Sequence, residues 1–292
     1  MSLVRGHPLI TFLVLAYALT WLAWPMWALG FWPNPVFSFG PFLAALIVLA
    51  LTRGKSGVGG LLRRMVRWRV ELRWYAVALL LPAELALAAT VLNVLLGAQA
   101  PSSVELGSWT ILLLTFAIVL LIPGMGGAWE EPGWRGYALP RLQTGRSALL
   151  ASLILGVLIS GWHLPLMVAG QVHYSDVVLI IAAVIIFNWV FNNAQGSVLI
   201  TMLMHAMNNT ISGSFFSLMF SGADSVRQSW LLAAVWCVVA IVVAIVVVIV
   251  AGPAHLSRKH RKQEEEEEEE DGKKGAEEPG VARPGVVKPT PA

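Results

Sequence analysis

Three short stretches of the sequence place polar or ionisable side chains beside long apolar runs. The first reads EEPGWRGYALPRL and runs from Glu130 to Leu142. If this stretch is helical, Glu131 and Arg135 stand four residues apart on one face and can form an ion pair. The arginine would then hold one of two adjacent carboxylates, and Glu130 could point elsewhere and serve as a general base. The alternative is an ordinary cluster of interfacial charges.

The other two stretches contain histidines. His163 lies in SGWHLP, where it is either a candidate for catalysis or a hydrogen-bonded packing residue. His205 and Asn209 stand four residues apart and therefore share one face of a helix. An imidazole and a carboxamide in this arrangement could bind a metal ion or donate hydrogen bonds to an oxyanion. A polar pair that joins two helices in a membrane has the same pattern.

The composition indicates that a membrane must position these residues. Of the 292 residues, 57% are hydrophobic and 13% are charged, which is more apolar surface than one soluble domain can bury. The apolar runs approach the ~20 residues that cross a bilayer, and lipid offers backbone amides no partners, so long runs without alternation form helices. We therefore predict an all-α, polytopic transmembrane helix bundle. Its eight predicted spans are residues 8–29, 36–52, 74–97, 109–125, 147–170, 177–194, 197–220 and 230–252.

The basic residues predict how this bundle is oriented. Seven of them lie between Arg53 and Arg73, whereas residues 97–108 contain no Lys or Arg. The positive-inside rule therefore places the first of these loops in the cytoplasm and the second outside. Alternation then makes residues 126–146 a cytoplasmic loop, and it puts both termini of this multi-pass protein on the cytoplasmic side of the plasma membrane.

The chain divides into a membrane part, residues 1–252, and a polar tail, residues 253–292. The tail includes the run from Glu264 to Glu270 and is predicted to be disordered and cytoplasmic, because it is too charged to bury a core. The net charge of +3 does not indicate nucleic-acid binding, since the basic residues lie in loops beside apolar runs. Membrane lipid is the partner that the sequence predicts directly.

Taken together, the three stretches resemble the CAAX protease and bacteriocin-processing family of intramembrane proteases, also called type II CAAX prenyl endopeptidases. The matches to its Glu-Glu-x-x-x-Arg and His-x-x-x-Asn motifs are Glu130, Glu131, Arg135, His205 and Asn209. The family's Phe-x-x-x-His motif is matched only at His163, because Ile159 stands in place of the phenylalanine. The resemblance covers about residues 129–209.

The resemblance implies an endopeptidase that cleaves a peptide or a lipidated protein near the cytoplasmic membrane face. It implies that Glu130 activates water with help from His163, that His205 and Asn209 stabilise the oxyanion, and that Glu131 and Arg135 give structural support. In a metal-dependent version, Glu130, His163 and His205 would bind zinc. No His-Glu-x-x-His run supports that version.

One geometric condition and two rival functions accompany this interpretation. His163 lies beyond the middle of its predicted span, so it can meet Glu130 only if the fifth helix begins later or the fourth segment reaches deeper. A bacteriocin self-immunity protein would use the same residues without proteolysis. A transporter would also place ionisable residues at depth, but it would favour matching helix breaks in two repeated halves, for which the sequence gives no sign.

Overall fold

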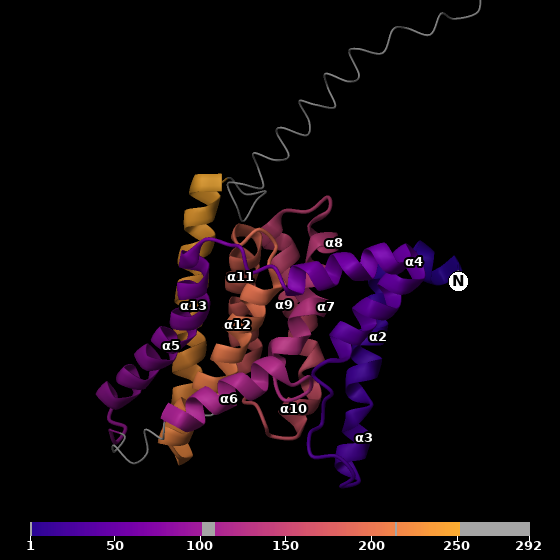
Figure 1. Cartoon of the computed structure of the whole chain (residues 1–292). Coiled ribbons are helices and arrows are strands. Elements are labelled where there is room, and N and C mark those ends of the chain that lie inside the picture. Colours follow the sequence, from indigo (N-terminus) through magenta and orange to yellow (C-terminus); the bar gives the residue numbers. More distant parts are fainter. Residues whose placement is uncertain (1, 101–108, 214, 252–292) are drawn as a thin grey trace, which may run out of the picture.

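The computed structural model describes residues 2–100, 109–213 and 215–251, and the predicted tail lies outside these residues. All regular elements in this part of the chain are helices (Figure 1). The longer ones are α2 (Pro8–Trp21), α4 (Gly40–Met65), α5 (Leu72–Leu95), α6 (Trp109–Leu121), α9 (Ala148–Trp162), α11 (Asp176–Asn193), α12 (Val198–Asn208) and α13 (Gly222–Ala251). The shorter ones are α1 (Ser2–Gly6), α3 (Ala23–Ala28), α7 (Glu131–Gly133), α8 (Leu139–Gln143) and α10 (Leu164–Val168), with the turns η1 (Gly127–Glu130), η2 (Trp134–Ala138), η3 (Asn209–Gly213) and η4 (Phe216–Met219).

The lengths of these helices confirm the predicted helical membrane bundle. Five segments are long and apolar enough to cross a bilayer: Pro8–Ala28, Gly40–Met65, Leu72–Leu95, Asp176–Asn193 and Gly222–Ile249. Two further apolar helices are shorter, Thr110–Leu121 and Ala148–Trp162, and α12 has 11 residues. Each of the eight predicted spans contains a helix. Eight complete crossings remain a prediction, because the three short helices cannot span ~30 Å of hydrocarbon by themselves.

Helix α4 continues past the predicted end of the second span. The sequence predicted a loop from residue 53 onward, but the helix breaks at Gly54 and then continues to Met65. Gly54 has φ 60° and ψ −151°, a backbone conformation that glycine adopts without a steric penalty. The prediction of a loop was wrong here, because hydropathy marks only where a helix leaves the apolar layer. The half of α4 after Gly54 carries Lys55, Arg63 and Arg64.

Helix α12 lies between two packed halves of the core. Its residues Val198 and Met202 belong to a cluster that also contains residues of α2, α4, α9 and residues 127–142, here called the motif segment. Its residues Ile200 and Met204 belong to a second cluster with residues of α5, α11 and α13. Because α12 is enclosed from both sides, it can hold a polar side chain such as His205 away from lipid.

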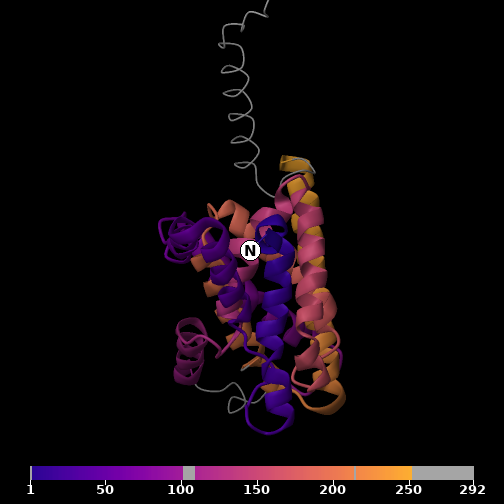
Figure 2. The ribbon, with the colours of Figure 1, turned by 90° about the vertical axis from the view of Figure 1, so that its right-hand side faces the viewer.

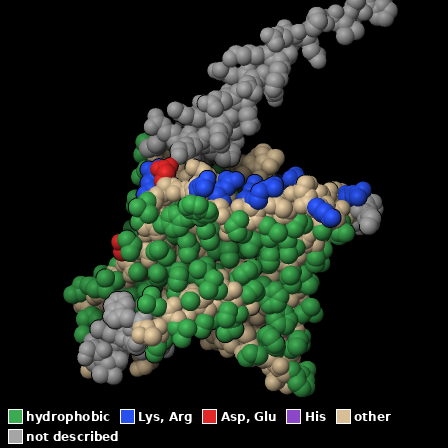
Figure 3. Space-filling model, viewed as in Figure 1, with side chains coloured by type: hydrophobic (Ala, Val, Ile, Leu, Met, Phe, Trp, Pro, Cys, Tyr) green, Lys and Arg blue, Asp and Glu red, His purple; other side chains and the backbone are tan. Residues whose placement is uncertain are grey.

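The outer surface gives the bundle two distinct ends. Lys and Arg side chains form a band near one end, above a face that is mostly hydrophobic (Figure 3). The start of α1 and the end of α13 both lie toward this basic end (Figure 1). In the view turned by 90°, α2 and α13 run roughly parallel to each other (Figure 2). Both ends of the described chain therefore share one side, and its identity as the cytoplasmic side stays a prediction.

Candidate active site

The motif segment is a succession of short helical turns in the interior of the bundle. The 3-10 turn η1 ends at Glu130, α7 begins at Glu131, and the π-turn η2 contains Arg135. Helix α7 has Pro132 in its first turn, where no intrahelical amide bond is lost. Turns of the π type inside helices often mark functional sites.

This segment corrects the prediction that residues 126–146 are a cytoplasmic loop. All residues from Gly127 to Leu139 except Trp129 are buried, and α7 lies in the middle of the bundle (Figure 1). The fifth helix begins at Ala148, as predicted. The fourth segment therefore reaches deeper than expected, because its polar groups bond to one another and its apolar side chains, such as Trp134, fill the core.

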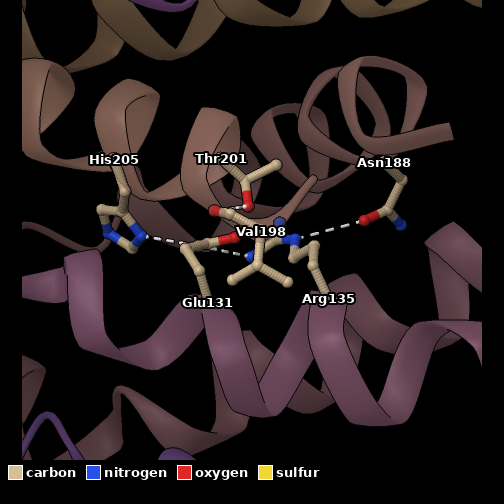
Figure 4. Close-up of polar contacts among 6 residues, drawn as sticks. All are labelled: Glu131, Arg135, Asn188, Val198, Thr201 and His205. Atoms are coloured by element: carbon tan, nitrogen blue, oxygen red, sulfur yellow. Dashed lines mark hydrogen bonds and ion pairs between the residues drawn. The ribbon is translucent and has the colours of Figure 1, made fainter. Parts of the chain in front are cut away.

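One carboxylate oxygen of Glu131 accepts hydrogen bonds from two side chains (Figure 4). Arg135 Nη1 lies 2.9 Å from Glu131 Oε1, which confirms the ion pair that the spacing predicted. His205 Nδ1 lies 2.7 Å from the same oxygen. Glu131 is fully buried, and a buried carboxylate needs such charge-assisted hydrogen bonds because its desolvation is costly. The two contacts fix the carboxylate between the π-turn and α12.

The second nitrogen of His205 points toward the backbone at Gly127. A Cβ atom at Gly127 would lie 2.1 Å from His205 Nε2, so only glycine leaves room for the ring. The side-chain amide of Asn209 is oriented with its oxygen toward Gly127 and its nitrogen toward His205. The oxygen accepts a hydrogen bond from the Gly127 N–H at 3.0 Å, and the nitrogen donates to the His205 carbonyl at 3.3 Å. Asn209 thus holds the turn before Glu130 against α12. A second N–H of the Asn209 amide is not used by these two contacts.

Glu130 is buried next to this network. Its Oε2 atom has no hydrogen-bond partner among the described residues, and the same is true of Glu131 Oε2. Glu130 interacts electrostatically with His205, Glu131 and Arg135, so it belongs to the same site. Buried polar atoms without partners in a protein are commonly satisfied by water or by a ligand. Glu130 therefore offers an acceptor in the interior for a small polar molecule.

His163 lies at the junction of α9 and α10. Its Nδ1 atom is 2.8 Å from the carbonyl oxygen of Ile159. Because a carbonyl only accepts, Nδ1 carries the proton and the neutral ring keeps Nε2 as an acceptor. His163 also interacts electrostatically with His205. Ile159, which replaces the family's phenylalanine, thus orients the histidine through its backbone.

Two residues of α11 complete the site and were not predicted. Arg135 Nε donates to Asn188 Oδ1 at 3.2 Å (Figure 4). The Arg135 guanidinium also lies 4.9 Å above the ring of Phe187, whose centroid is 5.6 Å from that of His205. Neither residue is ionisable, so the cost of burying charge did not point to them. The signal in the sequence is a neutral asparagine within an apolar span.

The geometry does not supply the zinc ligands that the metal-dependent version requires. In the part of the chain that the structure describes, no group of three or more His, Cys, Asp or Glu side chains is arranged to hold a metal ion. The carboxylate that contacts His205 is Glu131 and not Glu130. The side chains of Glu130, His163 and His205 therefore do not fit a zinc ion as they stand.

Comparison with known proteins points to one family. Residues 107–211 match the model of the family described as type II CAAX prenyl endopeptidase Rce1-like. The chain is also similar to CAAX prenyl protease 2 of Methanococcus maripaludis, with 23% identity over 182 residues that cover 58% of this chain and 67% of that protein. Both matches support assignment of the chain to the CAAX protease family.

These two matches confirm the resemblance that the motifs indicated. The matched segment contains the whole motif segment, α9, α11 and α12, and with them all the predicted site residues. Both matches are described as prenyl proteases, and at the level of the family they support a hydrolase of peptide bonds.

Proposed function

We propose that this protein is an intramembrane endopeptidase of the CAAX type that cleaves a prenylated or otherwise lipid-linked protein near the cytoplasmic face of the plasma membrane. The observation that carries the proposal is the unequal environment of two adjacent buried carboxylates. Glu131 is bound by Arg135 and His205, whereas Glu130 presents a buried oxygen that has no hydrogen-bond partner among the residues that the structure describes. The relative named as a prenyl protease supports the class of substrate.

In the proposed reaction, the Glu130 carboxylate takes a proton from water while the water oxygen attacks the scissile carbonyl carbon. The resulting tetrahedral intermediate carries an oxyanion. When the C–N bond breaks, the proton on Glu130 passes to the leaving amine and Glu130 is again a carboxylate. The products are a carboxylic acid and an amine, and transfer of the acid proton to the amine leaves a carboxylate and an ammonium group. His163 Nε2, free as an acceptor in the neutral ring, would orient the water beside Glu130.

His205 can stabilise the oxyanion if its Nε2 carries a proton. Nδ1 donates to the Glu131 carboxylate, so a donor at Nε2 requires the doubly protonated ring, which a neighbouring carboxylate favours. The remaining N–H of Asn209 is the second proposed donor. Donors that are fixed before the reaction cost no reorganisation when the charge develops.

This assignment also keeps the net charge of the buried site constant during the step. Before attack, the charges on Glu130 and Glu131 balance those on Arg135 and the protonated His205. During attack, one negative charge moves from Glu130 to the oxyanion, and the sum is unchanged. Transferring charge within a balanced cluster avoids the large cost of creating an unpaired charge in an apolar interior.

The test is cleavage of a synthetic peptide that ends in a prenylated CAAX sequence by purified protein in detergent, measured by mass spectrometry. Glu130→Gln is nearly isosteric but cannot accept the proton, so we expect a loss of ~10²–10⁴-fold in kcat with normal folding. Glu71→Gln removes a glutamate from an exposed ion pair with Arg73 and should cleave at the parent rate. Equal rates for Glu130→Gln and the parent would refute the protease assignment of this site and favour the immunity or transport functions.

Two further arms of the assay address substrate and metal. An unprenylated version of the peptide should be cleaved more slowly if the lipid group is part of recognition. Direct activation of water by Glu130 predicts unchanged turnover in a strong chelator. Loss of activity that zinc restores would instead favour the metal-dependent version.

A further inference from the structure

The buried arginine of the motif is held from two sides. The guanidinium of Arg135 is almost fully buried, and an arginine in an apolar interior must have its N–H groups bonded. Nη1 donates to Glu131 at 2.9 Å and Nε donates to Asn188 at 3.2 Å. The planar guanidinium makes these two directions rigid with respect to each other. The position of Asn188 therefore influences where Arg135 meets Glu131.

The amide of Asn188 has its orientation set by a third element. Ser152 Oγ donates its one proton to the Ala148 carbonyl at 2.7 Å. It can therefore only accept from Asn188 Nδ2, which lies 2.9 Å away. With Nδ2 committed to Ser152, the amide oxygen must face Arg135. Ser152 and Asn188 are both fully buried, so water does not compete for these bonds.

From these contacts we propose that Asn188 and Ser152 are positioning residues for catalysis, which act through Arg135 and Glu131 on the orientation of His205. The chain of bonds runs from Ala148 on α9 through Ser152, Asn188, Arg135 and Glu131 to His205 on α12. Phe187, next to Asn188, packs against both Arg135 and His205 and keeps the two at a fixed separation. The catalytic part of this inference rests on the proposed function.

The first experiment separates positioning from substrate binding. Asn188→Leu has a similar volume but cannot accept from Arg135. We expect kcat to fall by about 10–100-fold with little change in KM, because supporting bonds of this kind fix the geometry of the reacting groups. Ser152→Ala should lower kcat less, and should have no further effect when Asn188 is already leucine. A raised KM with unchanged kcat would mean that Asn188 affects substrate binding, and it would overturn the proposal.

The second experiment asks whether Asn188 acts through Arg135. Arg135→Lys can still reach Glu131 but has no Nε for Asn188. If the proposal is right, Asn188→Leu in the Arg135→Lys background adds less than about 2-fold to the loss, because the effects of residues that act as a unit do not add. If the loss of kcat in the double variant equals the product of the losses in the two single variants, Asn188 acts independently of Arg135 and contributes only to general stability.

The chain provides a closely matched control. Arg227 Nε donates to Asn93 Oδ1 at 2.6 Å, between α13 and α5, and this bond has the same chemistry as the bond from Arg135 to Asn188. No contact links Asn93 to the motif residues among the hydrogen bonds of the described part of the chain. Asn93→Leu should therefore lower thermal stability but leave kcat of the folded protein unchanged. An equal loss of kcat in Asn93→Leu would overturn the positioning role.

A readout without substrate distinguishes failure of this inference from failure of the proposed function. The protein has six histidines, and the ¹⁵N signal of His205 can be assigned by its absence in His205→Gln. Asn188→Leu should shift this signal, whereas Asn93→Leu should not. If the parent cleaves nothing but the shift occurs, the proposed reaction fails and the positioning chain stands. If the His205 signal is the same in Asn188→Leu and the parent, the positioning chain fails whatever the activity.

Discussion

At the residue scale, the site depends on a close approach between the Gly127 backbone and the His205 ring. The added Cβ of any other residue would come within 2.1 Å of Nε2 and 2.5 Å of Cε1. The ring cannot move aside freely, because its Nδ1 is bonded to Glu131. The nitrogen that we assign to the oxyanion therefore lies against a position where only glycine fits.

Gly127→Ala should consequently reduce turnover by about 10²-fold, because the methyl group displaces the imidazole and small misplacements of catalytic groups are costly. The measurement is kcat on the prenylated peptide, together with thermal unfolding in detergent. Gly60→Ala is the matched control, since a Cβ at that helical position meets nothing within 4 Å. Normal turnover in Gly127→Ala would mean that the position of His205 does not limit the reaction.

Some contacts of the site follow from local spacing and others do not. The ion pair of Glu131 with Arg135 could be predicted, because residues four apart are neighbours on any helix. The bond of His205 to Glu131 joins residues 74 positions apart, and no local pattern encodes which of two adjacent glutamates it contacts. The same holds for Asn188, whose partner Arg135 lies in another helix. The catalytic roles of Glu130, His163, His205 and Asn209 remain proposals.

At the scale of elements, the motif segment packs directly against the start of α4. A Cβ at Gly133 would lie 2.5 Å from the backbone carbon and oxygen of Pro41. The contact joins α7 to the first turn of α4. Because the carbon and oxygen that a Cβ would meet there belong to the backbone, they cannot move aside as the end of a flexible side chain can. This contact fixes the depth at which Glu130 and Glu131 enter the bundle.

Gly133→Ala should therefore separate α7 from α4 and lower the free energy of unfolding by ~1–3 kcal/mol, the usual cost of overpacking a core. The melting temperature in detergent measures this loss, and kcat should fall with it because the two glutamates move. Gly59→Ala should be tolerated, since its Cβ would meet only Arg63 Nη1 at 3.9 Å. Unchanged stability in Gly133→Ala would show that α4 and α7 adjust to each other.

The elements themselves were predictable to different degrees. Long apolar runs predicted a helix in each of the eight intervals, because lipid leaves the backbone no alternative. The interior position of the motif segment was not predicted, since its charges suggested a loop. Those charges are buried because they pair with one another, which a hydropathy profile cannot register. The continuation of α4 beyond Gly54 to Met65 was missed for a similar reason: this half of the helix is polar and carries Lys55, Arg63 and Arg64, so its hydropathy predicted a loop.

At the scale of the whole molecule, charge distribution and connectivity agree on an orientation. The basic band and both described ends of the chain lie toward one end (Figures 1 and 3). The turn between α8 and α9 lies at this end, and the connection from α10 to α11 lies at the other (Figure 1). If the basic end is cytoplasmic, the proposed substrate reaches the site from inside the cell.

Cysteine labelling can test this orientation. The chain has one cysteine, Cys237, so a Cys237→Ser parent provides a background without thiols. Thr144 follows α8, Gln171 follows α10, and both are exposed. A membrane-impermeant maleimide should label Gln171→Cys in intact cells, and it should label Thr144→Cys only after the membrane is opened. The reverse pattern would place the basic end outside, against the positive-inside rule, and a cytoplasmic lipidated substrate would then have no route to Glu130.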